Sequence, residues 1–139
     1  MPDEAPLCFI DTNIWYYSLV EQDDPVKSQK ARELIRSVWP VVSTQVISEV
    51  CANLLKKAHT AEDILAEVIA SFYDDYVVVA IVQAVLLDAS RLRKRHSFSY
   101  WDSLIVSSAL AGSCKVLYSE DMQHKLVIDR RLTVLNPFL

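Results

Sequence analysis

The decisive stretch of the sequence is Leu7-Cys8-Phe9-Ile10-Asp11-Thr12-Asn13, in which four apolar residues run directly into three polar ones. A short continuous apolar run of this kind is typical of a strand buried on both faces. Asp, Thr and Asn are side chains that cap helix N-termini, so a helix is expected to begin close to Ile14. The stretch therefore predicts a buried strand that passes straight into a helix.

The same alternation of strand and helix continues along the chain. Further strands are expected at Pro40–Ser43, Tyr76–Ala80, Lys115–Tyr118 and Leu132–Leu135. The expected helices begin at Asp24-Pro25, at Ser43 or Thr44, at a capping box in Thr60–Asp63, at Val82 and at Tyr100, the last ending at Gly112. Apolar strands that alternate with helices indicate an α/β fold with a mostly parallel sheet of four to five strands flanked by helices. Residues 1–139 would form one domain.

Composition limits the classes of protein to which the chain can belong. Apolar residues make up 52% of the sequence, yet no apolar run approaches the ~20 residues that a membrane-spanning helix needs. Met1–Pro6 carry acidic residues where a secretory signal peptide would be basic. Cys8, Cys51 and Cys114 are widely spaced in apolar surroundings and are expected to be reduced thiols. We therefore expect a cytoplasmic protein.

Four acidic residues adjoin the apolar runs although they lie far apart in the chain: Asp11, Glu49, Asp102 and Asp121. Two of them follow expected strands, and the other two lie in expected helices. Ligands of parallel sheets bind beyond the carboxyl ends of the strands, so this fold would gather all four at one edge. Taken singly, Asp11 is more often a helix cap and Glu49 a solvated helix residue, while Asp102 and Asp121 are equally consistent with first-turn acids favoured by the helix dipole.

The grouping of these carboxylates predicts a metal site. Carboxylates gathered beside apolar residues repel one another unless a cation neutralises them. Oxygen donors favour Mg²⁺ or Mn²⁺ over Zn²⁺, and the three histidines are scattered along the chain. A metal held in this way can activate water for phosphodiester hydrolysis. Without the four acids, 14 acidic residues remain against 14 basic ones, so the net acidity of the chain equals the size of the expected site.

These segments together resemble the PIN-domain ribonucleases, and more closely the VapC-type toxins of toxin–antitoxin pairs. The motifs that carry the resemblance are Phe9–Ile14, Ser48–Val50, Tyr100–Val106, Leu117–Gln123 and Asn136–Phe138. The resemblance implies a compact α/β fold and cleavage of RNA with Mg²⁺ or Mn²⁺. It also implies a homodimer and inhibition by a cognate antitoxin protein.

The resemblance assigns roles residue by residue. Asp11, Glu49, Asp102 and Asp121 would be the catalytic, metal-binding acids. Asn13 and Ser119 would be polar supports that hydrogen-bond an acid or a metal-bound water. Glu120 is the neighbour of Asp121 and the rival for its role.

The chain departs from the family pattern at two loops where the family often has glycine. Here these loops read His124-Lys125 and Arg130-Arg131, which puts the local loop conformation in question but leaves the acids in place.

Basic and aromatic residues each allow two interpretations. The run from Arg91 to His96 holds Arg91, Arg93, Lys94 and Arg95, which would contact the RNA backbone or else form the solvated end of a helix. Trp15, Tyr16 and Tyr17 would stack on bases or else pack in the core.

Two other functions are consistent with the same residues. One is a PIN nuclease with a housekeeping role in RNA processing. The other is a non-enzymatic acidic-pocket module, such as a phospho-accepting receiver domain, which shares the parallel-sheet architecture. That class needs a pair of acids after the first strand, where this chain has only Asp11.

Overall fold

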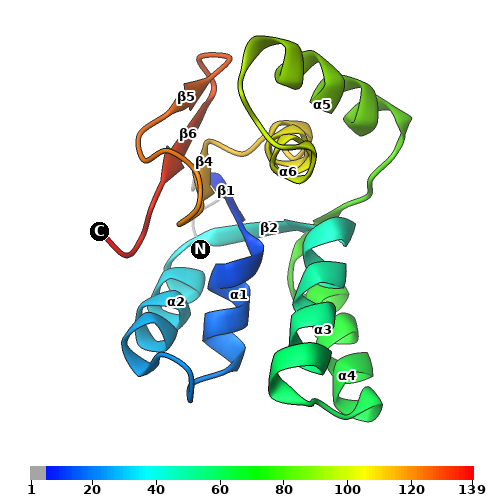
Figure 1. Cartoon of the computed structure of the whole chain (residues 1–139), viewed down its shortest axis with the longest axis vertical. Helices are drawn as coiled ribbons and strands as arrows, with labels where there is room; N and C mark the ends of the chain where they lie inside the picture. Colours follow the sequence, from blue (N-terminus) through cyan, green and yellow to red (C-terminus); the bar gives the residue numbers. More distant parts are fainter. Residues whose placement is uncertain (1–5) are drawn as a thin grey trace.

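The computed structural model describes residues 6–139, in which the chain forms six strands and six helices (Figure 1). In chain order they are β1 (Leu7–Ile10), α1 (Thr12–Leu19), α2 (Pro25–Ser37), β2 (Trp39–Ser43), α3 (Thr44–Ala58), α4 (Glu62–Asp75), β3 (Val77–Val79), α5 (Gln83–Arg95), α6 (Tyr100–Ala111), β4 (Val116–Tyr118), β5 (Val127–Ile128) and β6 (Leu132–Leu135). The acidic residues Asp3 and Glu4, which entered the expectation about a signal peptide, lie outside the described residues. No helix within residues 6–139 is both long enough and apolar enough to cross a membrane.

The strands form one sheet in the order β3-β2-β1-β4-β6-β5. All neighbouring pairs are parallel except β5 and β6, which are antiparallel. The predicted α/β fold with a mostly parallel sheet is confirmed. The expected number of four to five strands was wrong by one, because β5 has only two residues and is too short to leave a periodic pattern in the sequence.

The order of the strands reverses direction at β1. From β1 the chain adds β2 and then β3 on one side, and later adds β4 and β6 on the other. Such a reversal opens a crevice outside the carboxyl ends of the two central strands, where α/β proteins bind ligands. Here those ends are followed by Asp11 and Ser119.

Helices cover both faces of the sheet. Figure 1 shows α1 to α4 below the central strands and α5 with α6 above them. Most side chains of β1 and β2 are buried between these layers, as is Leu117 at the centre of β4, which is expected for continuous apolar strands. Helix α6 is buried from Ser103 to Leu110, because the sheet lies on one side of it and α5 on the other.

The aromatic residues of α1 belong mainly to the core. Trp15 and Tyr16 are buried, and the ring of Trp15 lies 5.0 Å from that of Phe72 and 4.9 Å from that of Tyr76. Tyr17 is half-buried and packs edge-on against Phe138. The core interpretation of Trp15 and Tyr16 therefore holds over the base-stacking one.

Gly112, the only glycine, follows α6 as expected but for a different reason from the one predicted. Its φ is −81°, an angle that any residue adopts, and the left-handed residue is the next one, Ser113, at φ 58°. A Cβ at Gly112 would lie 3.0 Å from the side chain of Val41 and 3.2 Å from that of Val79. The glycine is thus needed for the close approach of α6 to the sheet.

The start of α4 also differs from the prediction. The helix begins at Glu62 after Ala61, which has no side chain that could cap it. The capping box expected at Thr60–Asp63 does not form.

Candidate active site

The four acids expected to form the site line one cavity of about 360 Å³ at the edge of the sheet. Asp11 follows β1 and Asp121 lies three residues beyond β4, while Glu49 comes from α3 and Asp102 from the first turn of α6. The other lining residues are Thr12, Asn13, Gln45, Ala52, Asn53, Trp101 and Ile105. No Lys, Arg or His lines this cavity, so within the described residues the carboxylates face one another without a basic partner.

Asp11 is held in place by the helix that it caps. Its Oδ1 accepts a hydrogen bond of 2.8 Å from the backbone N–H of Thr12, and its Oδ2 accepts one of 2.9 Å from Ser119 Oγ. Burial raises the pKa of Asp11 to about 6, although both hydrogen bonds act to lower it, and the nearby charges of Asp102 and Glu49 raise it further. The protein therefore positions this carboxylate without compensating its charge.

Glu49 is positioned by two neighbours that also line the cavity. Thr12 Oγ1 donates to its Oε1 at 2.9 Å, and Gln45, one helical turn earlier on α3, donates from Nε2 to the same oxygen at 3.4 Å. Asp102 is fixed through its backbone, whose N–H donates to the N-cap side chain of Ser99 at 3.1 Å. Within residues 6–139 no hydrogen-bond donor reaches the carboxylate of Asp102, which leaves it free for a ligand.

Ser119 and Asn13 lie where polar supports were expected. Ser119 Oγ donates to Asp11 and accepts from the backbone N–H groups of Asp121 at 3.3 Å and Met122 at 3.4 Å. Asn13 Nδ2 donates to Asp121 Oδ2 at 3.1 Å and to Glu120 Oε1 at 3.2 Å. The loop after β4 is therefore tied to both Asp11 and α1.

Glu120 points into a different environment from Asp121 and does not line the cavity. Its carboxylate forms a salt bridge of 2.8 Å with Lys27 and accepts a hydrogen bond from the hydroxyl of Tyr17. Burial acts to raise the pKa of Glu120, but the bonds from Lys27 and Tyr17 outweigh it and the pKa is lowered. The pKa of Asp121 is instead raised, by burial first and then by the charges of Glu120 and Asp102.

The donors fit a hard divalent cation in chemistry, although they are not assembled into a finished coordination shell. Among residues 6–139 no group of three or more His, Cys, Asp or Glu side chains is arranged so as to hold a metal ion. The cavity nevertheless offers oxygen donors from four carboxylates, of which Asp11 and Asp121 have raised pKa values. Carboxylate oxygens are the ligands of Mg²⁺ and Mn²⁺, and a cation would supply the missing positive charge.

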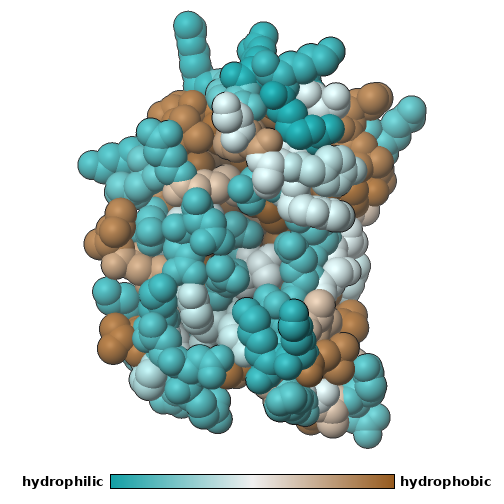
Figure 2. Space-filling view, in the orientation of Figure 1, coloured by the Kyte–Doolittle hydropathy of each residue, from teal (hydrophilic) through white to brown (hydrophobic). Residues whose placement is uncertain are grey.

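The basic run of α5 divides into paired and unpaired side chains. Arg91 bonds Asp88 at 2.7 Å and Asp129 at 2.6 Å, so it ties α5 to the turn between β5 and β6. Arg93 lies 4.8 Å from the ring centroid of Tyr100 and donates to Ser103 Oγ at 2.6 Å. Lys94 and Arg95 are exposed, and Figure 2 shows hydrophilic residues over the upper end of the molecule, where α5 lies. The three residues after Leu92 keep charge available at the surface, while that of Arg91 is neutralised.

Six cavity residues were not predicted as site residues from the sequence, and three of them, Thr12, Gln45 and Trp101, contact or adjoin the acids. Gln45 had a readable signal, because it lies four residues before Glu49 and so on the same face of a helix. Trp101 precedes Asp102 directly, but its sequence neighbours do not reveal that its side chain is exposed.

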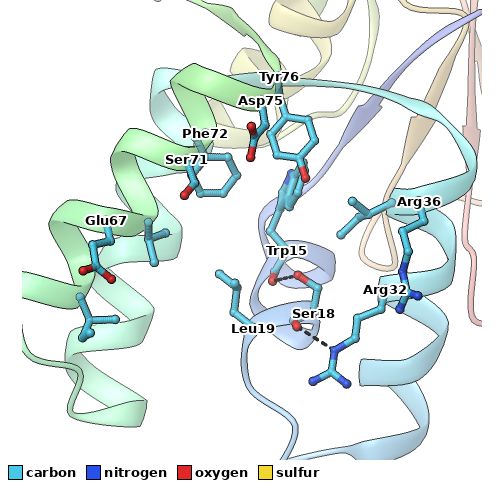
Figure 3. Close-up of a pocket in the computed structure, with 13 residues that line it drawn as sticks. Trp15, Ser18, Leu19, Arg32, Arg36, Glu67, Ser71, Phe72, Asp75 and Tyr76 are labelled. Carbon is cyan, nitrogen blue, oxygen red and sulfur yellow. Dashed lines mark hydrogen bonds between the residues drawn. The ribbon is translucent and has the colours of Figure 1, made fainter. Parts of the chain in front are cut away.

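A second cavity, of about 480 Å³, lies between α1, α2 and α4 (Figure 3). Its walls combine Trp15, Leu19 and Phe72 with Arg32 and Arg36 on one side and Glu67 and Asp75 on the other (Figure 3). Arg32 Nε donates to the backbone oxygen of Ser18 at 3.1 Å. None of the residues expected to form the site lines this cavity, so the candidate active site is the smaller, acidic one.

Comparison with known proteins gives one family. A family model for the PIN domain matches residues 8–128. No curated protein sequence matches the chain.

Solved structures share the fold at low sequence identity. The sarcin–ricin loop cleaving toxin VapC20 of Mycobacterium tuberculosis is 18% identical, with a TM-score of 0.67 over 82% of this chain and 89% of that one. A toxin–antitoxin complex from Klebsiella pneumoniae is 17% identical, with a TM-score of 0.67 over 94% and 97%. VapBC2 from Rickettsia felis, bound to a DNA fragment from its promoter, is 15% identical, with a TM-score of 0.63 over 94% and 99%.

Proposed function

This chain belongs to the PIN-domain family, and we propose on that premise that it is an endoribonuclease that depends on Mg²⁺ or Mn²⁺. The observation that carries the proposal is the cavity into which Asp11, Glu49, Asp102 and Asp121 converge without a basic side chain. Such a site has an excess of negative charge that a divalent cation would relieve. Family membership also removes the receiver-domain alternative.

The proposed reaction is hydrolysis of a phosphodiester bond by water. A cation held by these carboxylates would lower the pKa of a bound water and neutralise charge on the scissile phosphate. The chain supplies the positioning: Thr12 and Ser119 orient Asp11, Thr12 and Gln45 orient Glu49, and Asn13 orients Asp121. These bonds fix the rotamers of Asp11, Glu49 and Asp121 before the cation and RNA bind, which is the main contribution a protein makes to such a site.

We further propose that the chain is a toxin held inactive by a cognate antitoxin protein, and that it works as a homodimer in the cytoplasm. The support is that structures with the same fold include a VapC toxin and toxin–antitoxin complexes. Arg93, Lys94 and Arg95 are proposed to contact the RNA backbone, since phosphate contacts dominate nucleic-acid affinity. Arg91 is left out of this set because Asp88 and Asp129 already bind it.

The first experiment measures cleavage of RNA by the purified protein. Cleavage should require Mg²⁺ or Mn²⁺, should stop on addition of EDTA, and should fall by about 10³-fold or more in Asp11→Asn. Asp74→Asn is the matched control, because Asp74 is an exposed acid at the far end of α4. Full activity in Asp11→Asn would refute the proposed site.

A second experiment separates a toxin from a housekeeping nuclease. Induced expression of the chain should arrest growth, and Asp11→Asn should not. Sequencing of RNA 5′ ends after induction, with Asp11→Asn as reference, would locate the cleaved bonds. Unaltered growth together with efficient cleavage in vitro would favour the housekeeping role.

A further inference from the structure

An exposed tryptophan stands at the rim of the acidic cavity. Trp101 is 59% exposed and directly precedes Asp102 at the start of α6. It lines the acidic cavity and also a neighbouring hollow of about 530 Å³. The two hollows share Gln45, Glu49, Ala52 and Trp101, so one groove runs from the four acids past the indole ring.

The surroundings of Trp101 hold its position while leaving its ring uncovered. Gln45 Nε2 donates to the backbone oxygen of Trp101 at 3.3 Å. The ring of Tyr100 meets that of Trp101 edge-on, with 5.1 Å between the centroids, and Arg93 lies over Tyr100. Ser103 Oγ accepts from Arg93 and donates to the backbone oxygen of Tyr100, which links α5 to the same turn. The indole is thus supported from one side and free on the other.

The other tryptophan near the site shows what a structural tryptophan looks like in this chain. Trp15 is 3% exposed, donates from Nε1 to the backbone oxygen of Ile10 at 3.0 Å, and packs against Phe72 and Tyr76. Trp101 differs in its exposure and in its polar atom, because within residues 6–139 no acceptor binds its indole N–H, and its one aromatic neighbour, Tyr100, is itself 48% exposed. What sets this ring apart from the other exposed apolar side chains is that it adjoins exposed Tyr100 and lines both hollows beside the four acids, which points to a ligand that covers it.

We propose that Trp101 is a platform on which an unpaired base of the RNA stacks, next to the phosphate that the four acids cleave. This role rests on the proposed ribonuclease function and names the part of the substrate that the groove recognises. Every base has a flat face that stacks on indole, so the contact tolerates sequence but requires a base that is not paired within a duplex.

The groove has polar chemistry suited to the same ligand. Gln45 Oε1 is buried with no hydrogen-bond donor within residues 6–139, although the amide lies between Glu49 and Trp101. Because this oxygen is buried, an N–H group on the edge of a base would pair with it only once the Gln45 side chain turns toward the groove. Arg93 lies against Tyr100 and adds a positive charge close to Trp101. This charge would offset the negative charge of the four acids as an RNA strand approaches the groove.

The test measures binding of a short single-stranded RNA in the presence of Mg²⁺, in an Asp11→Asn background that keeps the RNA intact. Trp101→Ala should weaken binding by about 5- to 150-fold, the range of one lost aromatic stack, and Trp101→Phe should keep most of the affinity. Removing the base, but not the sugar, at the nucleotide beside the cleaved bond should weaken binding to the parent protein. It should have little further effect in Trp101→Ala, because the two changes remove the same contact.

Fluorescence gives a second measurement that does not depend on the alanine variant folding. Trp15 is buried, so Trp39→Phe leaves Trp101 as the one largely exposed tryptophan. Single-stranded RNA should quench its emission, and RNA duplex of the same length should quench it much less. Absence of quenching overturns the stacking role. So does unchanged RNA binding in Trp101→Ala combined with a changed oligomeric state in light scattering, which would assign the indole to a protein interface.

The outcome is separable from that of the proposed nuclease function. Cleavage by the wild-type protein with unchanged binding in Trp101→Ala rejects the platform alone. Stacking without any metal-dependent cleavage rejects the nuclease and keeps an RNA-binding groove.

Discussion

Glu120 and Asp121 are adjacent in the chain but their carboxylates are in opposite electrostatic situations. Glu120 meets Lys27, Tyr17 and Asn13, and its pKa is lowered. Asp121 receives one hydrogen bond from Asn13, faces the acidic cavity, and has a raised pKa. The protein has compensated the first charge internally and has left the second one uncompensated.

This difference separates a structural carboxylate from one that awaits a ligand. A carboxylate that the fold has already paired is a poor choice for a metal, because binding the metal would break its bond to Lys27. An uncompensated carboxylate lowers the stability of the protein in the absence of a ligand, and binding of a cation restores that stability. By this criterion Asp121 belongs with Asp11 in the site, and Glu120 holds the loop that carries it.

The contrast between Glu120 and Asp121 is tested most directly by neutralising each residue in turn. Asp121→Asn should lower kcat/KM by about 10²–10³-fold, while leaving the fold intact, because it removes a donor of the proposed metal site. Glu120→Gln should lower kcat/KM by less than about 10-fold but destabilise the protein by about 1–2 kcal/mol, because Lys27 loses its charged partner. Steady-state cleavage rates and denaturant unfolding measure the two effects.

A double variant serves as the control for Glu120. Lys27→Met combined with Glu120→Gln removes both partners, and its stability should recover part of the loss seen in Glu120→Gln alone. The assignment would be reversed if Glu120→Gln abolished metal-dependent cleavage and Asp121→Asn did not.

The pH dependence of stability offers a second comparison, between Asp11 and Glu120. The pKa of Asp11 is raised to about 6 in the folded, metal-free protein, so the folded state binds this proton more tightly than the unfolded state does. The stabilisation is complete below the unfolded pKa near 4 and is lost as the pH rises through 6, by up to about 3 kcal/mol. Glu120 has the opposite sign, since its lowered pKa gives stability that is lost as the pH falls.

Unfolding in EDTA at pH 4.5 and pH 8 isolates the contribution of Asp11. Asp11→Asn lacks this titration, so it should become more stable relative to the wild type at the higher pH, by about 2–3 kcal/mol. Mn²⁺ should remove the advantage by stabilising only the wild type. If the free energy of unfolding changed equally with pH in the two proteins, the pKa of Asp11 would not be raised in the folded state.

The parallel sheet and the gathering of the four acids at one cavity could be predicted from the sequence, because their signals are local. Asp11 ends an apolar strand, and Asp102 lies in the first turn of a helix that begins and ends where the pattern predicts. The sequence could not show which of Glu120 and Asp121 faces the cavity, because the answer depends on Lys27, which lies 93 residues from Glu120 in the chain. The exposure of Trp101 was equally hidden, since it depends on how α5 and α3 pack around α6.

Strand β3 is a second case in which the local sequence was not enough, because a strong strand signal did not predict the length and exposure of the strand. The run from Tyr76 to Ala80 is the most β-branched in the sequence, yet only Val77–Val79 form a strand, and this strand lies at one edge of the sheet and is partly exposed. β-Propensity reports how side chains fit a pleated surface, and the position of the strand in the sheet decides how much of that surface is covered. The neighbours of a strand are set by crossovers that local sequence does not encode.

The smallest expected effect concerns Lys125, in the first of the two loops where a glycine usual in the family is missing. Lys125 has a φ of 70°, and Arg130, in the turn between β5 and β6, has one of 57°; glycine adopts both conformations without strain. The backbone of Lys125 is held there by its N–H, which donates to the backbone oxygen of Val134 at 2.7 Å. The fold therefore imposes a glycine-like conformation on a residue that resists it.

Lys125→Gly should raise the free energy of unfolding by about 0.5 kcal/mol, since relief of the left-handed strain is partly offset by the greater entropy of glycine in the unfolded chain. Lys125→Ala removes the same charge but keeps the Cβ, so it should give no such gain, and the difference between the two variants in denaturant unfolding measures the relief of strain less the entropic cost of glycine. Cleavage should stay within about two-fold in Lys125→Gly, because Asn13 and Ser119 fix Asp121 independently of this turn. A large loss of cleavage in Lys125→Gly would instead mean that the strained turn, and not these two side chains, sets the direction in which Asp121 points.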